Sequence, residues 1–105
     1  MKFEIEISPE AIKSIEAQAR FIAEEQLEPQ SAEIWLAEVY DAITSLNFLP
    51  GRCSLAPENK FLDETIHMLP IYRHLILFMI DSDASTVRVY SFRAGRELPD
   101  QPNDK

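Results

Sequence analysis

Three arginines lie close together near the end of the chain, at Arg88, Arg93 and Arg96. The planar guanidinium group binds phosphate or carboxylate through two parallel hydrogen bonds, so these arginines could recognise an anionic partner. They could instead form surface ion pairs with Glu97, Asp100 or a glutamate of a helix. The pattern leaves both interpretations open, and the choice depends on the elements that carry the arginines.

The remaining residue types favour no enzymatic centre. His67 and His74 are the only histidines, and neither their spacing nor the acids near them completes a metal-binding motif. Gly51 and Gly95 are the only glycines, which excludes the glycine-rich loops that bind phosphate, and the lone Cys53 excludes an intramolecular disulfide. We therefore expect no metal and no cofactor, and we interpret both histidines as surface or cross-strand residues.

Charge is unevenly distributed along the 105 residues, whose net charge is −8. Residues 1–51 hold ten acids and three bases, whereas residues 52–105 hold eight acids and seven bases. Non-specific binding to nucleic acid depends on the neutralisation of phosphates by Lys and Arg. The bulk charge therefore argues against direct DNA binding by this chain alone, and only the C-terminal half could meet an anionic partner.

The length of the chain fits one domain with one hydrophobic core. It has no apolar stretch of about 18 residues, as a membrane span requires, and it begins with the strand-like "MKFEIEIS" in place of a signal peptide. We expect a cytoplasmic protein with no membrane partner, a single domain over residues 1–98 and a flexible C-terminal tail over residues 99–105.

The periodicity of apolar residues predicts a strand and then two helices. "KFEIEI" alternates as a half-buried strand does, and "SPE" begins a helix with Ser8 as its N-cap and Pro9 at its first position. A second helical pattern follows Pro29 and is stopped by Pro50 and Gly51. The apolar positions of the two helices are Ile12, Ile15, Ala19 and Ile22, then Trp35, Val39, Ala42, Ile43, Leu46 and Leu49. Because the connection is short, we expect an antiparallel hairpin whose apolar stripes face one sheet.

Three further strands are predicted after the polar connection "GRCSLAPEN". They are "TIHMLP", "IYRHLILFMI" and "TVRVYSFR", with the turn "DSDAS" before the last of them. The middle strand is apolar on both faces, which places it in the centre of the sheet. The order β-α-α-β-β-β predicts an α+β fold in which the helical hairpin packs on a small antiparallel sheet.

The pairing of the last two strands decides where the arginines meet. If Ile80 pairs with Thr86, then Arg73 lies opposite Arg93 on one face, and the two guanidinium groups form an anion-binding cluster at the strand exit. If Ile80 pairs with Val87 instead, this juxtaposition disappears. Both registers are compatible with the pattern.

These segments together resemble the RelE/ParE superfamily of bacterial toxins, in particular its ParE-like plasmid stabilisation branch. The resemblance rests on "AIKSIEAQARFIAEE", "AEIWLAEVYDAITSLNFLPGRCSLAPEN", "YRHLILFMID" and "VRVYSFRAGRELP", and it covers roughly residues 3–98. It implies a toxin that a cognate antitoxin neutralises in a hetero-oligomer. ParE-like members are associated with inhibition of DNA gyrase, which is therefore the expected target, and RelE-like members with cleavage of mRNA on the ribosome.

The resemblance also implies roles for individual residues. Arg73, Arg93 and Arg96 would form the target-binding patch, and Arg73 and Arg96 would be the catalytic residues if the chain is a RelE-like endoribonuclease. The C-terminal tyrosine that assists that reaction has no counterpart here, and Ala94 replaces a histidine that is common in ParE-like relatives. We therefore expect a toxin that is not an enzyme. A ribosome-dependent mRNA endoribonuclease is the alternative, and a non-toxic partner in an autoregulatory complex is the second alternative.

The patch assignment predicts that Arg93→Ala or Arg96→Ala abolishes toxicity while the fold and antitoxin binding survive. Substitution of an exposed side chain changes stability by only about 0.5 kcal/mol, so unfolding would not explain the loss of toxicity.

Overall fold

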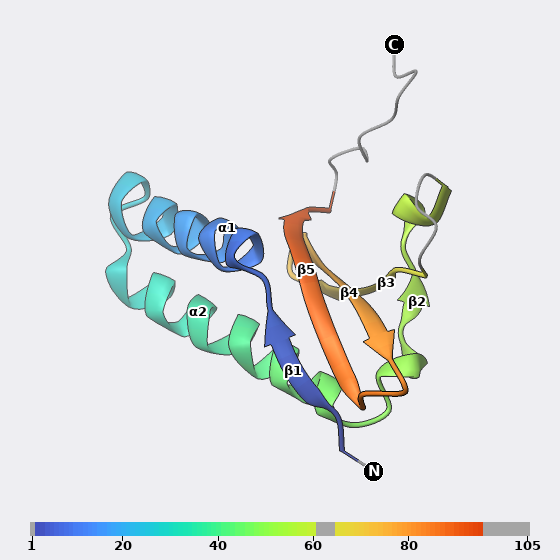
Figure 1. Cartoon of the computed structure of the whole chain (residues 1–105). Helices are drawn as coiled ribbons and strands as arrows, with labels where there is room; N and C mark the ends of the chain where they lie inside the picture. The colour runs from blue at the N-terminus through green and yellow to red at the C-terminus, as the bar shows by residue number, and fades with distance from the viewer. Residues whose placement is uncertain (1, 61–64, 96–105) are drawn as a thin grey trace.

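The computed structural model describes residues 2–60 and 65–95, and these residues form two layers (Figure 1). Helices α1 (Pro9–Arg20) and α2 (Pro29–Thr44) lie side by side and pack on one face of a five-stranded sheet. The strands are β1 (Glu4–Ile7), β2 (Ser54–Leu55), β3 (His67–Ile71), β4 (His74–Asp81) and β5 (Thr86–Ala94). The predicted α+β fold with a helical hairpin on a sheet is confirmed.

Helix α1 begins where the sequence predicts because Ser8 caps it. The Oγ of Ser8 accepts a hydrogen bond from the backbone nitrogen of Ala11 at 3.0 Å, and Pro9 stands in the first turn. The same hydroxyl donates to the backbone oxygen of Tyr90 at 3.0 Å. The start of α1 is thereby tied to β5.

A π-helical turn, Phe21–Glu25, and a short connection reverse the chain before α2. Leu27 in this connection has a left-handed backbone with φ of 56°. Helix α2 ends at Thr44 and a 3-10 turn, Ser45–Asn47, follows it. The helical conformation therefore ends slightly before Pro50, the residue that the sequence marks as the stop. None of the helices in the described ranges is long and apolar enough to cross a membrane.

The strands follow the order β1-β5-β4-β3-β2, so β4 is central as predicted. β1 runs parallel to β5, with Ile5 opposite Val87, which makes the sheet mixed. The expectation of a wholly antiparallel sheet is wrong in this detail. Both helices and strands β2, β3 and β4 separate β1 from β5 in the chain, and so long a connection permits parallel pairing. The connection after α2 also contains β2, which pairs with β3 but is too short to show an alternating pattern.

A β-bulge interrupts the ladder between β4 and β5. Near the turn Ile80 pairs with Val87, whereas beyond Phe78 the partners shift by one position because Tyr90 is an extra residue in β5. The predicted register with Ile80 opposite Thr86 is wrong, and the alternative is right only between the turn and the bulge. Neither register anticipates the pairing at the far end of β5.

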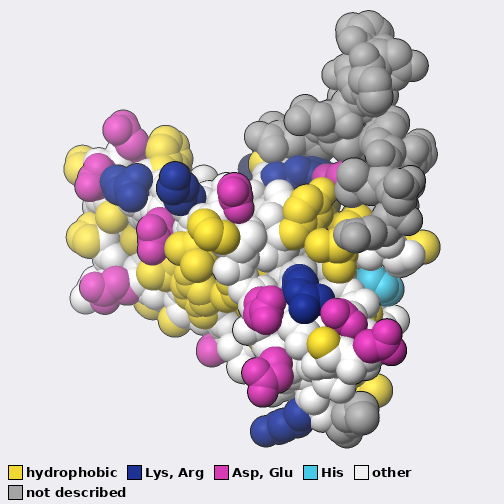
Figure 2. Space-filling view, in the orientation of Figure 1, with side chains coloured by type: hydrophobic (Ala, Val, Ile, Leu, Met, Phe, Trp, Pro, Cys, Tyr) yellow, Lys and Arg dark blue, Asp and Glu magenta, His cyan; other side chains and the backbone are white. Residues whose placement is uncertain are grey.

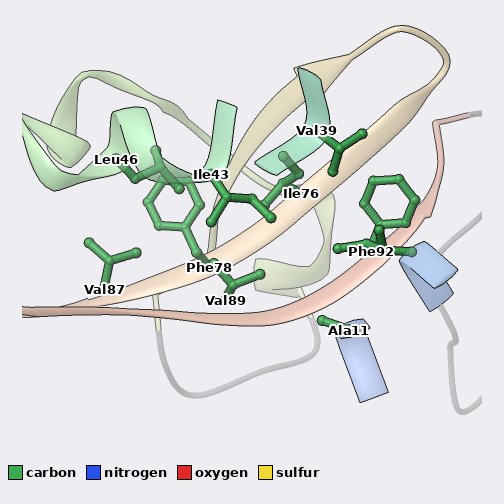
Figure 3. Packing of buried hydrophobic residues seen from close by; sticks show 10 residues of the cluster. Ala11, Val39, Ile43, Leu46, Ile76, Phe78, Val87, Val89 and Phe92 are labelled. Atoms are coloured by element: carbon green, nitrogen blue, oxygen red, sulfur yellow. The ribbon is translucent and has the colours of Figure 1, made fainter. Parts of the chain in front are cut away.

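The main core lies between the helices and the sheet. Figure 3 shows Phe78 of β4 next to Leu46 and close to Val89, with Ile43 and Ile76 beside them. The buried members of this cluster are Ala11, Ile15, Val39, Ile43, Leu46, Ile76, Phe78, Val87, Val89 and Phe92. The helical stripes and the inward positions of β4 and β5 therefore meet as their periodicity predicts.

The opposite face of the sheet carries a second, smaller cluster. Ala56 and Ile66, which flank the segment after β2, are buried against Leu77 of β4. Half-buried side chains of Met68, Leu75, Met79 and Tyr90 pack around them. Both faces of β4 are therefore covered, which explains why its sequence is apolar throughout.

Candidate functional site

Arg93 forms a largely buried ion pair with Glu58. Its Nε donates to Oε2 of Glu58 at 2.7 Å and its Nη2 donates to Oε1 at 3.2 Å, so the pair is bidentate. Nη1 also donates to the backbone oxygen of Ala94 at 2.9 Å. The two side chains are only 12% and 11% exposed. Glu58 thus compensates the charge of Arg93, and it was not among the partners expected from the sequence, which were Glu97, Asp100 or a helix glutamate.

This burial changes the expected effect of substituting Arg93. The small cost expected of Arg93→Ala rested on an exposed side chain, and Arg93 is not exposed. Removal of its guanidinium would leave the Glu58 carboxylate buried without that ion-pair partner, which costs about 3 kcal/mol in comparable cases. Loss of toxicity in Arg93→Ala would therefore not distinguish a lost contact from a weakened fold.

Arg73 lies at the turn between β3 and β4, across from Gly95. The backbone nitrogen of Gly95 donates to the Arg73 oxygen at 2.6 Å, whereas Arg93 pairs with Leu75. A Cβ atom at residue 95 would lie 3.1 Å from that oxygen, so glycine permits the close approach. The Arg73 side chain is exposed and makes no ion pair with any residue of the described ranges. The structure therefore does not place Arg73 and Arg93 opposite one another.

The turn that carries Arg73 is held from a second side by α2. Tyr72 has a left-handed backbone with φ of 54°, a conformation that is uncommon for a residue with a bulky side chain. Its hydroxyl donates a hydrogen bond to the Glu38 carboxylate on α2. The turn is thus linked to α2 through the Tyr72 side chain and to Gly95 through the Arg73 backbone oxygen.

Two shallow grooves lie beside the turn and share His74. One groove of about 410 Å³ is lined by Tyr72, Arg73 and Gly95 among others. The other, of about 390 Å³, runs between α1 and the end of β5 and includes Phe21 and Phe92. An exposed guanidinium with apolar and aromatic side chains beside it is suited to contact with another macromolecule.

Both histidines pack against neighbouring rings. His74 stacks on Phe92 with ring centroids 4.8 Å apart, and Trp35 meets it edge-on at 5.9 Å. His67 stacks on Phe78 at 5.5 Å, and its Nδ1 lies 3.0 Å from the backbone oxygen of Cys53. These positions agree with the interpretation of both histidines as cross-strand residues.

Arg88, at the other end of β5, forms two exposed ion pairs. Its Nη1 donates to Asp81 at 2.7 Å and its Nε donates to Glu6 at 3.2 Å. The hydrogen bond from Arg88 holds the pKa of Asp81 below its usual value, and the same bond raises the pKa of Arg88. Arg88 therefore forms surface ion pairs, with partners that are not among those expected from the sequence.

Arg96 lies outside the described residues, as do Glu97, Asp100 and the predicted tail of residues 99–105. The boundary expected at residue 98 falls in the same segment. Within residues 2–60 and 65–95, no group of three or more His, Cys, Asp or Glu side chains could hold a metal ion.

Three residues that position the arginines were missed from the sequence. Glu58 belongs to "APEN", where its place in a polar connection gave no reason to expect burial. Glu38 was one of many acids on the outer surface of a helix, and Tyr72 was read as part of a continuous strand. The two predicted strands are divided after Pro70, whereas the turn lies at Tyr72 and Arg73, where no Gly, Asn or Asp is present to indicate it.

Comparison with known proteins agrees with this architecture. Residues 5–99 match the family described as ParE toxin of type II toxin-antitoxin system, parDE. The fold is similar to a structure described as the chromosomal ParDE TA system from P. aeruginosa, with a TM-score of 0.71, 8% identity, and coverage of 89% of this chain and 96% of that one.

It is also similar to the archaeal RelE-RelB complex from Pyrococcus horikoshii OT3, with a TM-score of 0.53, 11% identity, and coverage of 93% of this chain and 100% of that one. The search of curated proteins finds no match. Because the family match spans nearly the whole chain, the protein belongs to the ParE toxin family of type II toxin–antitoxin systems.

Proposed function

We propose that this ParE-family toxin inhibits an essential cellular target, DNA gyrase, by binding it without chemical turnover. Arg73, Arg93 and Arg96 constitute the proposed contact patch, with different tasks. Arg73 contacts the target directly, Arg93 holds the end of β5 through Glu58, and Arg96 follows Gly95 in the sequence. The toxin acts in the cytoplasm, where its target is found.

The observation that carries this proposal is the state of Arg73. Its side chain is exposed, it forms no ion pair within the described ranges, and both sides of its turn are bonded to other elements. Such a guanidinium has no ion pair with a described residue to give up when it forms a bidentate contact with a carboxylate or phosphate of a partner. Binding is favoured over catalysis because His74, the imidazole nearest in sequence, packs in a ring cluster, stacked on Phe92 and met edge-on by Trp35.

The proposal includes a cognate antitoxin that neutralises the toxin in a hetero-oligomer. The two similar structures are described as a ParDE toxin–antitoxin system and a RelE-RelB complex, and a partner of the same kind is inferred for this chain. The antitoxin would be a small protein encoded beside the toxin.

Expression of the chain alone in bacteria tests the proposed target. We expect growth arrest with filamentation and loss of negative supercoiling in a reporter plasmid, and co-expression of the adjacent gene should restore growth. A rapid stop of translation with cuts in mRNA at the ribosomal A site would contradict gyrase inhibition and support the endoribonuclease. Normal growth with confirmed soluble protein would contradict both activities. It would support the remaining interpretation, a non-toxic partner in an autoregulatory complex.

Arg73→Ala tests the contact patch. This substitution should remove toxicity while circular dichroism and antitoxin binding stay unchanged, because the side chain is exposed. Arg20→Ala is the matched control, since it removes an exposed arginine from the end of α1. If Arg73→Ala were as toxic as Arg20→Ala, the assignment of Arg73 would be incorrect.

A further inference from the structure

We propose that the free edge of β2 is a self-association surface, at which two copies of this chain join their sheets across a two-fold axis. β2 is the last strand in the order β1-β5-β4-β3-β2, and among the described strands it pairs only with β3 (Figure 1). In the dimer, Leu55 of one protomer lies opposite the partner's Leu55. Self-association of this kind is independent of the proposed target.

The backbone of Leu55 points out of the sheet. The nitrogen of the next residue, Ala56, donates to the backbone oxygen of Ile66 on the β3 side at 2.8 Å. Because the backbone groups of successive residues point to opposite sides of a strand, the N–H and C=O of Leu55 point away from β3. Two antiparallel copies of β2 would therefore exchange two hydrogen bonds between Leu55 and the partner's Leu55, as a hydrogen-bonded pair in an antiparallel ladder does.

Three exposed apolar side chains belong to β2 and the segment that leads into it. We call Phe48, Leu49 and Leu55 the edge patch, and they are 57%, 60% and 57% exposed. Only a 3-10 turn, Pro50–Arg52, and Cys53 separate Leu49 from β2. Since single exposed apolar residues are common on surfaces, it is the gathering of three within residues 48–55 that indicates a protein contact.

The loop before β2 is fixed by its own hydrogen bonds. Leu49 has a left-handed backbone with φ of 50°, which is uncommon for a residue with a side chain of this size. The Nη1 of Arg52 donates to the backbone oxygens of Phe48 at 2.9 Å and Leu49 at 3.1 Å. Its Nη2 donates to the Oγ of Ser45 at 3.3 Å. The loop thus holds an unfavourable conformation that leaves two apolar side chains in solvent, and such backbone often accompanies binding sites.

Charge favours a second copy of this chain as the occupant. The net charge is −8, and the helical hairpin, residues 9–44, holds eight acids and two bases. Figure 2 shows acidic side chains spread over the helical layer with few basic ones. In contrast, Arg52 is the only charged residue in the sequence from Ser45 to Pro57. Two copies can therefore meet at the edge patch with little of the like-charge repulsion that contact through the helices would bring.

The two edges of the sheet differ in the same way. β1, at the opposite edge, carries the exposed acids Glu4 and Glu6, and charged side chains discourage pairing between edges. β2 consists of Ser54 and Leu55 and has no charge. Its shortness limits the backbone contact to one residue pair, so the apolar side chains must supply the rest. We therefore expect a reversible dimer and not a permanent one.

Pairing at β2 leaves the Arg73 turn accessible. Leu55 lies opposite His67 at the start of β3, whereas Arg73 follows the other end of that strand, Ile71. The dimer would therefore present two exposed Arg73 side chains, one on each protomer. Such bivalence raises the apparent affinity for a partner that offers two sites within reach.

Sedimentation of the purified chain over a concentration series tests the dimer. We expect the average mass to rise reversibly toward that of two chains. Leu55→Asp should weaken the association by more than about tenfold, because it places like charges opposite each other. Leu27→Asp is the matched control at a leucine that is 81% exposed between the two helices, and it should alter the association by less than about twofold. A chain that stays monomeric throughout, or equal effects of the two substitutions, would overturn the proposal.

Amide hydrogen exchange of the wild-type chain locates the contact without any substitution. Exchange of the Leu55 amide should slow as the concentration rises, because its N–H becomes hydrogen-bonded to the partner. The Ala56 amide, which already donates to Ile66, and the amides of β1 should keep their rates. Slowing in α1 or α2 in place of Leu55 would move the interface to another surface and overturn the proposal.

The product of the adjacent gene distinguishes a second copy from another occupant. Protection of the Leu55 amide that appears only when this product is added, while the free chain stays monomeric, would assign the edge to that partner and overturn self-association. None of these measurements uses growth arrest, so a failure of the proposed function would leave their outcome unchanged.

Discussion

Arg88 and Arg93 stand on the same strand, yet their surroundings differ. The Arg88 side chain is 43% exposed and faces Asp81 and Glu6 in solvent, whereas Arg93 is 12% exposed and is gripped by both oxygens of Glu58. An ion pair exposed to water contributes little to stability. In the interior, a charge that loses its partner is strongly destabilising. The comparison shows that burial, and not residue type or strand position, decides which arginine is structural.

The largest predicted effect is that of Arg93→Ala on the free energy of unfolding. We expect it to fall by about 3 kcal/mol, because the Glu58 carboxylate stays buried after its ion-pair partner is removed. Arg88→Ala should cost much less, because its ion pairs are exposed to solvent. Urea denaturation of both variants measures the difference. If the two variants lost the same free energy of unfolding, the buried and the exposed ion pair would contribute equally to stability, contrary to this prediction.

A double substitution sharpens the same contrast. Arg93→Met combined with Glu58→Leu replaces the buried pair by apolar side chains of similar size. We expect this variant to unfold within about 1 kcal/mol of the wild type, since apolar replacement of a buried pair is often neutral or stabilising. Toxicity measured in this stable variant would then report on contact alone. If the free energy of unfolding fell as far as in Arg93→Ala, the ion pair would be more stabilising than the apolar side chains that replace it.

A smaller effect is expected at the tethered turn. Tyr72→Phe removes the hydroxyl that donates to Glu38, and it should cost about 0.5 kcal/mol at this exposed site. Glu38→Gln retains an acceptor oxygen and should behave like the wild type, whereas Glu38→Ala should match Tyr72→Phe. Toxicity should decline in Tyr72→Phe and Glu38→Ala because Arg73 is less firmly held. A decline in Glu38→Gln as well would point to charge in place of the hydrogen bond.

The smallest effect concerns pH at the exposed end of β5. Because the pKa of Asp81 is lowered in the folded chain, its ion pair stabilises the fold above the unfolded pKa of about 3.9 and is lost as pH falls through the lower folded value. The stability difference between wild type and Asp81→Asn should therefore shrink in acid. Chemical denaturation at several pH values below 5 would show it. A difference that grew on acidification would reverse the sign we assign.

Much of the fold could be predicted because it depends on local periodicity. The Ser8 cap, the two helical stripes and the fully apolar β4 each appear in a short window of sequence. The site was less predictable, because its partners come from distant segments. Glu58 and Arg93 are 35 residues apart, and Tyr72 and Glu38 are 34 apart.

The predicted register failed at the turn, where Ile80 pairs with Val87, and again at Tyr90, where a bulge shifts the pairing. The bulge adds one residue to β5, so Arg93 pairs with Leu75 and lies on the face that carries Glu58. No Gly or Pro in this strand announces the irregularity. The regular ladder that places Arg73 opposite Arg93 also requires Ile80 to pair with Thr86, which the structure does not show.

The sequence by itself determined the class of fold, the family and the acidic surface of the hairpin, since these follow from composition, periodicity and the order of short motifs. Only the tertiary structure decided the states of Arg73, Arg88 and Arg93. Packing buried Arg93 against Glu58 and left Arg73 exposed on a turn fastened to α2 and β5. Burial and long-range pairing control the energy of a charge, and neither can be read from its neighbours in the chain.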